Sequence, residues 1–555
     1  MKKAKLILCL FLAIVTLFTL VACSKTNQPS ATSQPGTTGQ PNATVKPGDT
    51  TPPPASGNET TAPTKPTEIV MGETGYLGRF LDGSSPAISL HAADLVYDTL
   101  FRIDPKTKEP YSRILESWEY TDELTFVMKL KPGVTFTNGN VADADDLLFA
   151  IMNHVERQDM LFSTIIQTMD IPNCTSDGEY TVTLKFNQPY GPGIFGSAYY
   201  LYDMDYCHEV GWDSPDWNNN PNGTGPYIVT DYATDDHITL QLKDNYWNSA
   251  NEQFDVQKWT IKYFPDIATM YMALEKGEVA LCPIYNFADY SRWLDNPGEN
   301  IGMNPCNMGA TMLFMMGPNN DPALADIRVR EALAIGVDWA AIGQMIMGDL
   351  YVPATSTLVS DSPFYKNVGA YEYNPERAKQ ILADAGYKEG DIHLYIYDMA
   401  VDLRKNLDEA FQAYAKDLGI TVEIEFGDIA SCMPRWTAPA PDGCDFGWMN
   451  IISGNIIREP HASYSSMYTP FFTWGMQQDP VFLEMATKAL NTIGDARIPL
   501  YHDVQQYIYD NYLAIPLYED FTVVAYRTDI FTPEVIADNS YTSMFVALRG
   551  LSLAG

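Results

Sequence analysis

Positive charge is scarce in this chain. Its 555 residues include 35 Lys and Arg against 70 Asp and Glu, which gives a formal net charge of -35 at pH 7. This balance argues against a nucleic-acid partner, because phosphate binding needs clustered Lys and Arg. The acidity favours solubility and gives a weak long-range preference for cationic ligands, but it does not identify a ligand.

The sequence signatures of catalysis are missing as well. The histidines are isolated, with no H-E-x-x-H and no short His/Cys metal cluster, and neither G-x-S-x-G nor the P-loop G-x-x-x-x-G-K-[ST] occurs. Paired catalytic carboxylates cannot be assigned in so acidic a chain. We therefore expect no cofactor, no metal site and no enzymatic activity, with a secreted hydrolase as a competing hypothesis. The seven histidines are His91, His154, His208, His237, His393, His461 and His502.

One glycine-rich motif is a false lead. Residues 191–196 read GPGIFG, which matches G-x-G-x-x-G, and they follow a strand-like run over residues 180–186. A dinucleotide site needs such a loop to open a helix within a βαβ unit. Pro189 and Pro192 interrupt the segment, and no regular helical pattern follows. The sequence therefore argues against nucleotide binding at this motif.

Close Cys-x-x-Cys spacings are absent from the eight cysteines. Cys9 lies in an apolar run at the N-terminus and Cys23 follows that run. The other six allow 15 full pairings. The local pair of Cys432 with Cys444 is the first to test, and free buried thiols remain an open alternative. These six are Cys174, Cys207, Cys282, Cys306, Cys432 and Cys444.

The N-terminus predicts export. Three lysines within the first five residues precede an apolar run over residues 6–22, which is typical of a signal peptide, although a transmembrane anchor is the alternative. Residues 20–23, LVAC, resemble a bacterial lipobox, in which Cys23 becomes the lipidated first residue of the mature protein. The remainder of the segment 23–67 is rich in Ser, Thr, Pro and Gly, which predicts a flexible tether. No comparable apolar run follows, so we expect no other span.

A sharp turn followed by a hairpin is predicted over residues 222–247. Gly223 and Gly225 can adopt backbone angles closed to other residues, and Pro226 fixes its own φ and pushes the residue before it away from helix. The alternating apolar runs after the turn suit two strands with one buried face. Similar alternation into a Pro-Gly turn predicts a strand pair over residues 124–136, and Asp143 then begins a helix.

Helical and strand patterns alternate in the second half of the chain. Asn374 is a cap followed by a proline at the first helical position, which predicts a helix up to Gly386. A strand over residues 392–397, a helix over 403–418 and a strand over 420–426 come next. This alternation favours an α/β fold with a mixed or parallel sheet covered by helices.

Several separated strings resemble one family, the extracytoplasmic solute-binding proteins of peptide ABC importers known as family 5. The resemblance runs from about residue 90 to 525. It implies an α/β, two-lobed fold like that of the periplasmic binding proteins, class II type, with an extra small domain. The strings are GTGPY (223–227), NYW (245–247), ILESWE (114–119), ALEKGE (273–278) and DIRVREALAI (326–335).

The resemblance also implies a division of the chain into lobes that close on a ligand. Closure by a hinge excludes water, so affinity depends on the equilibrium between the domains as well as on contacts. The expected parts are a signal peptide at 1–22, the lipidated Cys and linker at 23–67, a base lobe at 68–98, 189–304 and 520–555, a small domain at 99–188, and a second lobe at 305–519.

The candidate ligand-binding residues lie around residues 445–460. Asp445 to Trp448, DFGW, resembles the strand end where family members place an aromatic wall, followed by an aspartate that pairs with the α-ammonium of a peptide. No Asp occupies that place here; Glu459 is one candidate replacement, and Asn450 is another that suits a neutral ligand. A core position for Trp448 and a solvated surface position for Glu459 are the alternatives.

These observations predict a monomeric receptor held by lipid on the extracytoplasmic face of the cell membrane. It would capture short peptides and deliver them to a separate ABC permease and ATPase. The main alternative is a binder of oligosaccharide or another small solute on the same fold, since the 34 Tyr and 10 Trp could stack on sugars.

Overall fold

The computed structural model describes most of the chain after residue 66. The predicted signal peptide (1–22), Cys23 and all of the predicted linker except Thr67 lie outside the described residues. Those described are 67–74, 90–104, 107, 109–156, 165, 168–192, 199–211, 214, 219–284, 287–316, 321–438, 442–452, 460, 464, 479–542 and 545–554.

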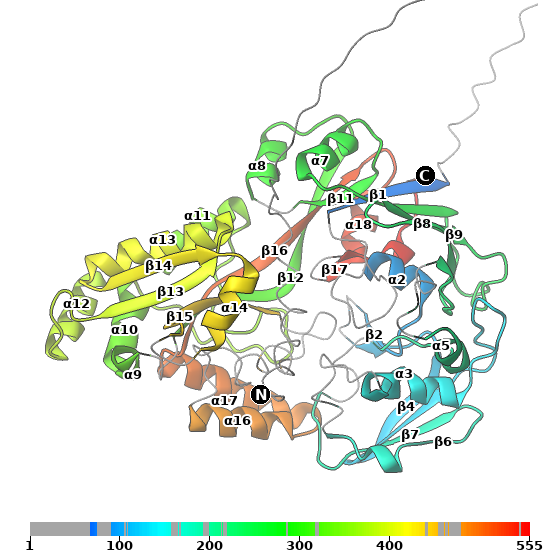
Figure 1. Ribbon diagram of the computed structural model, residues 1–555, viewed down its shortest axis with the longest axis horizontal. Coiled ribbons are helices and arrows are strands. Elements are labelled where there is room, and N and C mark those ends of the chain that lie inside the picture. Colours follow the sequence, from blue (N-terminus) through cyan, green and yellow to red (C-terminus); the bar gives the residue numbers. More distant parts are fainter. Residues whose placement is uncertain are drawn as a thin grey trace, which may run out of the picture.

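An eight-stranded sheet runs through the molecule (Figure 1). Strand β1 is parallel to both of its neighbours, and the other pairs are antiparallel. In spatial order the strands are β15 (Phe446–Ile452), β12 (Ile301–Met316), β16 (Ala514–Arg527), β11 (Leu281–Ile284), β1 (Glu68–Glu73), β10 (Lys258–Tyr263), β9 (His237–Leu242) and β8 (Tyr227–Ala233).

The predicted turn and hairpin form one end of this sheet, as β8 and β9. The turn before them packs on helix α2 (Leu90–Val96), where the amide of Gly225 donates to the carbonyl of Val96 at 2.8 Å. A Cβ on Gly225 would lie 2.5 Å from the carbonyl oxygen of Leu95, so only glycine fits this approach. The predicted turn and hairpin over residues 222–247 are therefore confirmed. Neither Gly223 nor Gly225 has a positive φ, so close packing rather than an unusual backbone angle is the reason for these glycines.

A buried charge network ties the C-terminal segment to this region. Arg549 Nη1 lies 2.6 Å from Asp98 Oδ1, with both side chains almost fully buried, and Arg549 Nη2 lies 2.9 Å from Glu252 Oε2. Thr224 Oγ1 also donates to Asp98 Oδ2 at 3.0 Å. Burial opposes ionisation of Asp98, but the charges of Arg549 and Arg113 outweigh it and hold its pKa below the ordinary value.

A small four-stranded sheet lies on one side of the molecule. It has the order β4 (Leu115–Asp122), β5 (Thr125–Leu130), β7 (Thr181–Lys185) and β6 (Thr175–Ser176), and it packs against α3 (Ala144–Glu156) around its own core. The side chain of Asp143 accepts from the amides of Asp145 and Asp146, at 2.8 and 3.2 Å. The predicted first strand, capping residue and helix are therefore confirmed. The second strand predicted after the Pro-Gly turn is wrong, because Thr135 makes only an isolated bridge with Val141 and β5 pairs with β4 and β7 instead.

A separate α/β region occupies the left of Figure 1. Strands β13 (His393–Met399) and β14 (Thr421–Gly427) pair in parallel, joined by α13 (Asp402–Asp417). Asn374 caps α12 (Pro375–Asp384) through the amide of Arg377, as predicted. The other helices are α9 (Pro322–Ala325), α10 (Ile327–Gly336), α11 (Trp339–Met347), α14 (Ile429–Thr437), α16 (Pro480–Leu490) and α17 (Arg497–Asp510).

The hydrophobic cores follow this arrangement. The largest includes β12, β15 and β16 together with helices α10 to α13, whereas β1 and β8 to β10 pack into another core with α2. The remaining elements are α5 (Met204–Val210), α7 (Ile267–Glu275), α8 (Phe287–Asp295), α18 (Pro533–Asn539), β2 (Arg102–Ile103), β3 (Pro110–Tyr111), β17 (Ser540–Thr542) and β18 (Phe545–Val546). The residue limits of the predicted lobes stay a prediction.

Among the described residues, no single helix is both long and apolar enough to cross a bilayer. The bent pair formed by α10 and the segment from Trp339 to Leu350 passes such a test by length and composition only.

Candidate ligand-binding site

Strands β12 and β16 each run from one hydrophobic core to another. Their register is regular from Ile301 opposite Arg527 to Asn307 opposite Phe521, and it resumes at Thr311 opposite Glu519 after a shift. Gly309 lies in the gap with a φ of 68°, in the left-handed region that glycine adopts easily. The hydrogen-bonded ladder is interrupted there, so this is the place where the two strands can bend.

Side chains fix the geometry of the interrupted segment. The Asn307 amide donates to Glu519 Oε2 at 2.9 Å, and the backbone amide of Ser360 donates to Glu519 Oε1 at 2.7 Å. The backbone amide of Gly309 donates to Asn307 Oδ1 at 2.7 Å. The largely buried Glu519 therefore ties both strands to the loop after α11.

Trp448 on β15 lies in the core of the α/β region. It is 4% exposed, and its ring packs against Phe314, Trp339 and Phe411 at centroid distances between 4.9 and 6.4 Å. Its indole nitrogen donates to Asp408 Oδ1 at 2.6 Å. The structure thus places Trp448 at the core position that the sequence left open, and a ligand-contacting role for it stays a prediction.

Of the other three candidate residues, the structure describes Asp445 in full, Asn450 through its backbone, and Glu459 not at all. Asp445 Oδ2 accepts from the amide of Tyr395 at 2.8 Å, and burial raises the pKa of this carboxyl to about 6. The backbone of Asn450 pairs with Met312, which places it on the edge strand β15; its side chain lies outside the description. Glu459 also lies outside the described residues. The structure does not bring these residues together into one described site.

A pair of buried aspartates that the sequence analysis missed lies next to Trp448. Asp398, at the end of β13, and Asp408, on α13, are 2% and 0% exposed. Arg404 Nη1 is 4.0 Å from Asp398 Oδ2 and donates to the carbonyl of Trp448 at 2.8 Å. The Asp398 carboxylate also accepts from the amide of Met399 at 2.7 Å. Two carboxyl groups here face one guanidinium.

Burial raises the pKa of both carboxyls. For Asp408 the negative charge of Asp398 adds to the rise, and the indole donor and Arg404 only partly offset it. The two groups titrate as a pair rather than singly. A signal for this pair existed in the sequence, because Asp408 shares the buried face of α13 with Leu407, Phe411 and Ala415, where an acidic residue is unexpected.

The GPGIFG motif has a structural role at its first glycine. The amide of Gly191 donates to the carbonyl of Leu490 on α16 at 2.7 Å, and Arg497 Nη1 of α17 donates to the carbonyl of Gly191 at 2.7 Å. A Cβ on Gly191 would lie 2.2 Å from the carbonyl oxygen of Thr492, so glycine is required. We call these three interacting segments the Gly191 contact. It joins parts of the chain about 300 residues apart.

Cys432 and Cys444, the pair that the sequence singled out to test first, form no disulfide, which is the alternative that the sequence left open. All six cysteines of the described region are free thiols. Both of these are buried, and burial raises the pKa of each to about 12, so they behave as small apolar core residues rather than nucleophiles. Cys444 is also engaged by Tyr397, whose amide donates to its sulfur at 3.2 Å.

Metal-binding geometry is not found within the described ranges. There, no three His, Cys, Asp or Glu side chains are grouped so that they could hold a metal ion.

Comparison with known proteins assigns the chain to a family. Residues 109–471, more than half of the chain, match the model of the bacterial extracellular solute-binding proteins, family 5 Middle. Heme-binding protein A of Haemophilus influenzae is 24% identical over 369 residues, which are 60% of this chain and 66% of that protein. The dipeptide-binding protein of Escherichia coli is 24% identical over 483 residues, 79% of this chain and 84% of that protein.

A solved structure agrees. The ABC transporter substrate-binding protein CtaP of Listeria monocytogenes matches with a TM-score of 0.76 at 20% identity, covering 88% of this chain and all of CtaP. This likeness confirms the predicted two-lobed α/β fold. Since the family whose model matches more than half of the chain consists of solute-binding proteins, the chain is a binding protein rather than an enzyme. It belongs to the bacterial extracellular solute-binding proteins, family 5.

Proposed function

We propose that this protein is the substrate-binding lipoprotein of an ABC importer, and that it captures short peptides between two lobes and delivers them to a membrane permease. The observation that carries this proposal is the pair of strands β12 and β16, which link separate cores and lose their register between Asn307 and Thr311. An interrupted ladder that joins two rigid bodies is the element that hinge closure needs.

Closure of the two lobes would couple ligand binding to the conformation of the protein. A ligand that contacts both lobes stabilises the closed arrangement by its differential affinity for it, and the apparent affinity falls when the closed state is rarely populated. The Gly191 contact lies between parts of the chain that the family resemblance assigns to different lobes. It would therefore contribute to the balance between the open and closed arrangements.

Peptide is the ligand class that we favour. One curated relative is named as a dipeptide-binding protein, and the acidic chain attracts an α-ammonium group more than an anion. In our proposal Asp445 and Glu459 supply negative charge near the ligand, Asn450 supplies a neutral hydrogen-bonding group, and Trp448 supports the wall from the core side. Oligosaccharide or another small solute is the alternative on the same fold.

Native mass spectrometry of the purified protein tests the ligand class. We expect co-purified species with peptide masses, and we expect added di- to pentapeptides to raise the unfolding temperature and to be recovered intact. Replacement of Glu459 by Gln should weaken binding of a peptide with a free α-ammonium group more than that of its N-acetylated form. Glu423→Gln is the matched control, because Glu423 is exposed on β14. A retained glycan, or a peptide series without effect, would overturn the peptide proposal.

The lipid anchor and the delivery step are tested separately. We expect Cys23→Ser to move the protein from the membrane fraction to the medium and to abolish incorporation of labelled fatty acid. In cells that depend on a captured peptide for growth, the same variant should lower uptake while the affinity of the purified protein is unchanged. Unchanged membrane association would refute the anchor.

A further inference from the structure

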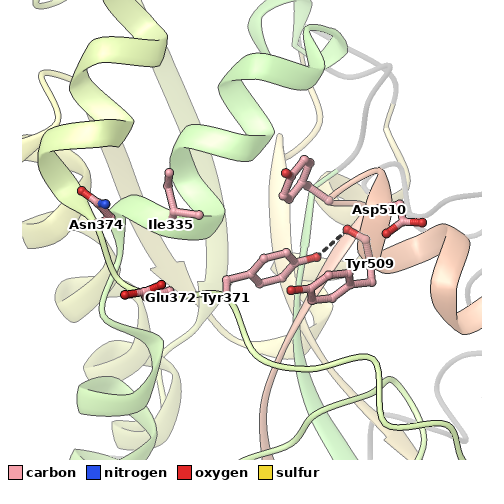
Figure 2. A pocket seen from close by; sticks show the side chains of 7 residues that line it. Ile335, Tyr371, Glu372, Asn374, Tyr509 and Asp510 are labelled. Carbon is pink, nitrogen blue, oxygen red and sulfur yellow. Dashed lines mark hydrogen bonds between the residues drawn. The ribbon is translucent and has the colours of Figure 1, made fainter.

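A cavity of about 340 Å³ opens in the α/β region, between the end of α10, the segment before α12 and the end of α17. None of its lining residues belongs to β12, β15 or β16, the strands of the candidate ligand-binding site. Figure 2 shows aromatic rings at the centre of this pocket and polar side chains on both sides. It is lined by Ile335, Tyr371, Glu372, Asn374, Tyr509, Asp510 and Tyr512.

Three tyrosines form an aromatic wall. The rings of Tyr371 and Tyr509 stack with centroids 4.4 Å apart and planes 4° apart, and Tyr512 lies 5.4 Å from Tyr371. The hydroxyl of Tyr371 donates to the carbonyl of Tyr509 at 2.7 Å, which fixes its ring (Figure 2). Burial raises the pKa of all three hydroxyls, so the rings are neutral phenols. The faces of such rings attract cations.

The charges around this wall all favour a cation. Glu372 and Asp510 line the pocket, no Lys or Arg does, and neither carboxylate is ion-paired among the described residues. The negative charge of Glu331, on the neighbouring helix α10, adds to the effect of burial in raising the pKa of the Tyr512 hydroxyl. The C-terminus of α17 lies at the pocket, and the carbonyl end of a helix carries partial negative charge.

Arg330, a cation near the pocket, is engaged elsewhere. Arg330 is buried, and its guanidinium donates to the carbonyls of Asn511 and Leu324, at 3.1 and 2.6 Å. The carboxylates that act on it are Asp479 and Asp326, neither of which lines the pocket. Arg330 therefore leaves the charge of the pocket uncompensated.

The backbone of Tyr512 supports a role for its ring. Tyr512 follows α17 with a φ of 52°, whereas Gly277, Gly386 and Gly419 occupy positive-φ positions just beyond the ends of other helices. A bulky residue with positive φ is strained, and such strain persists where the surrounding structure or function requires the side chain. The chain therefore accepts a strained turn that delivers an aromatic ring to this cavity.

We propose that this pocket is a second ligand site, which binds the ammonium group of a small organic cation. The tyrosine wall supplies cation–π attraction, and Glu372 and Asp510 supply the counter-charge. A quaternary or alkylated ammonium fits these groups, because it binds through aromatic faces and needs few directed hydrogen bonds. The site is independent of the solute proposed to bind between the lobes.

Calorimetric titration of the purified protein with choline and tetramethylammonium tests the site. The neutral isostere of choline, 3,3-dimethylbutan-1-ol, has the same shape without the charge, so we expect it to bind at least tenfold more weakly. Tyr512→Gly removes the ring at a backbone position that glycine favours, and we expect it to weaken choline binding at least tenfold. The double variant Glu372→Gln with Asp510→Asn should weaken binding by a similar factor and flatten its dependence on ionic strength.

Two matched controls separate the pocket from general effects of charge and aromatic surface. Tyr373→Leu removes an adjacent exposed tyrosine that does not line the cavity, and Glu376→Gln removes a carboxylate 85% exposed at the start of α12. Both should leave choline binding unchanged. Three outcomes would overturn the proposal: choline and its isostere bind equally, the pocket variants bind choline as tightly as the unchanged protein, or neither cation binds at 10 mM. Peptide titrations of the same variants should be unchanged, so failure here is distinct from failure of the peptide proposal.

Discussion

Replacement of Gly191 by Ala should open the Gly191 contact without unfolding the protein. The new Cβ would lie 2.2 Å from the carbonyl oxygen of Thr492, and ordinary contact begins at 3.4 Å, so the two segments must separate by roughly 1 Å. That separation breaks the hydrogen bond to Leu490 and the charged one from Arg497, each 2.7 Å long. At about 1 kcal/mol for the neutral bond and about 2 kcal/mol for the charged one, roughly 3 kcal/mol is lost. This corresponds to roughly a hundredfold shift toward separated segments.

Energy transfer between two labels measures this shift. Cysteines introduced at Val141 and Glu376, both exposed, place one label near the small sheet and the other on α12. We expect Gly191→Ala to lower the transfer efficiency and to weaken ligand affinity, with only a modest fall in unfolding temperature, because Leu490 alone among the contact residues packs in a hydrophobic core, that of the small sheet. Gly72→Ala is the control: its Cβ would meet the flexible side chain of Met270 within one core, so stability falls while label separation stays the same. Unchanged transfer and affinity in Gly191→Ala would refute the reasoning.

Three further substitutions test the packing and the buried charges. Gly225→Ala should destabilise the protein by about 3 kcal/mol in denaturant unfolding, because its Cβ would overlap the backbone of α2; a loss below about 1 kcal/mol would contradict the close approach. Asp98→Asn should cost about 3–5 kcal/mol at pH 7, since it leaves Arg549 without its buried partner. The pKa of Asp98 is lowered in the folded state, so this loss should shrink as pH falls below about 4; a loss independent of pH would exclude the ion pair as its cause. Asp408→Asn keeps an acceptor for Trp448 and removes a carboxyl whose pKa is raised in the folded state. Thermal unfolding should therefore show a free energy of unfolding that is higher by about 1–3 kcal/mol at pH 7, and this gain should vanish below about pH 4. Destabilisation at pH 7 would argue that the charge is needed.

Local signals in the sequence predicted much of the fold. The cap at Asn374, the proline after it and the glycine turn before β8 act over a few residues, and each lies where predicted. Longer-range features could not be read in this way. The pairing of β12 with β16 joins residues such as Asn307 and Glu519, 212 positions apart, and the register shift between these strands leaves no local pattern.

The candidate site was harder to predict for a related reason. Whether Trp448 lies in a core or on a surface depends on Phe314 and Phe411, which come from other elements. Asp398 and Asp408 are ten residues apart, and only the packing of α13 against β13 and β15 buries them together. The local pair Cys432 and Cys444 suggested a disulfide by its spacing alone, and the structure keeps both as buried thiols.

The two strands that cross between the cores also constrain the kind of motion available. Their backbone hydrogen bonds run across the ribbon, so the ribbon can twist about its length, but it cannot stretch without a change in covalent geometry. One end of each strand is anchored in each core. The two parts of the protein built around these cores should therefore rotate relative to each other rather than move apart. The distance along β12 and β16 between the two cores should be the same with and without bound ligand.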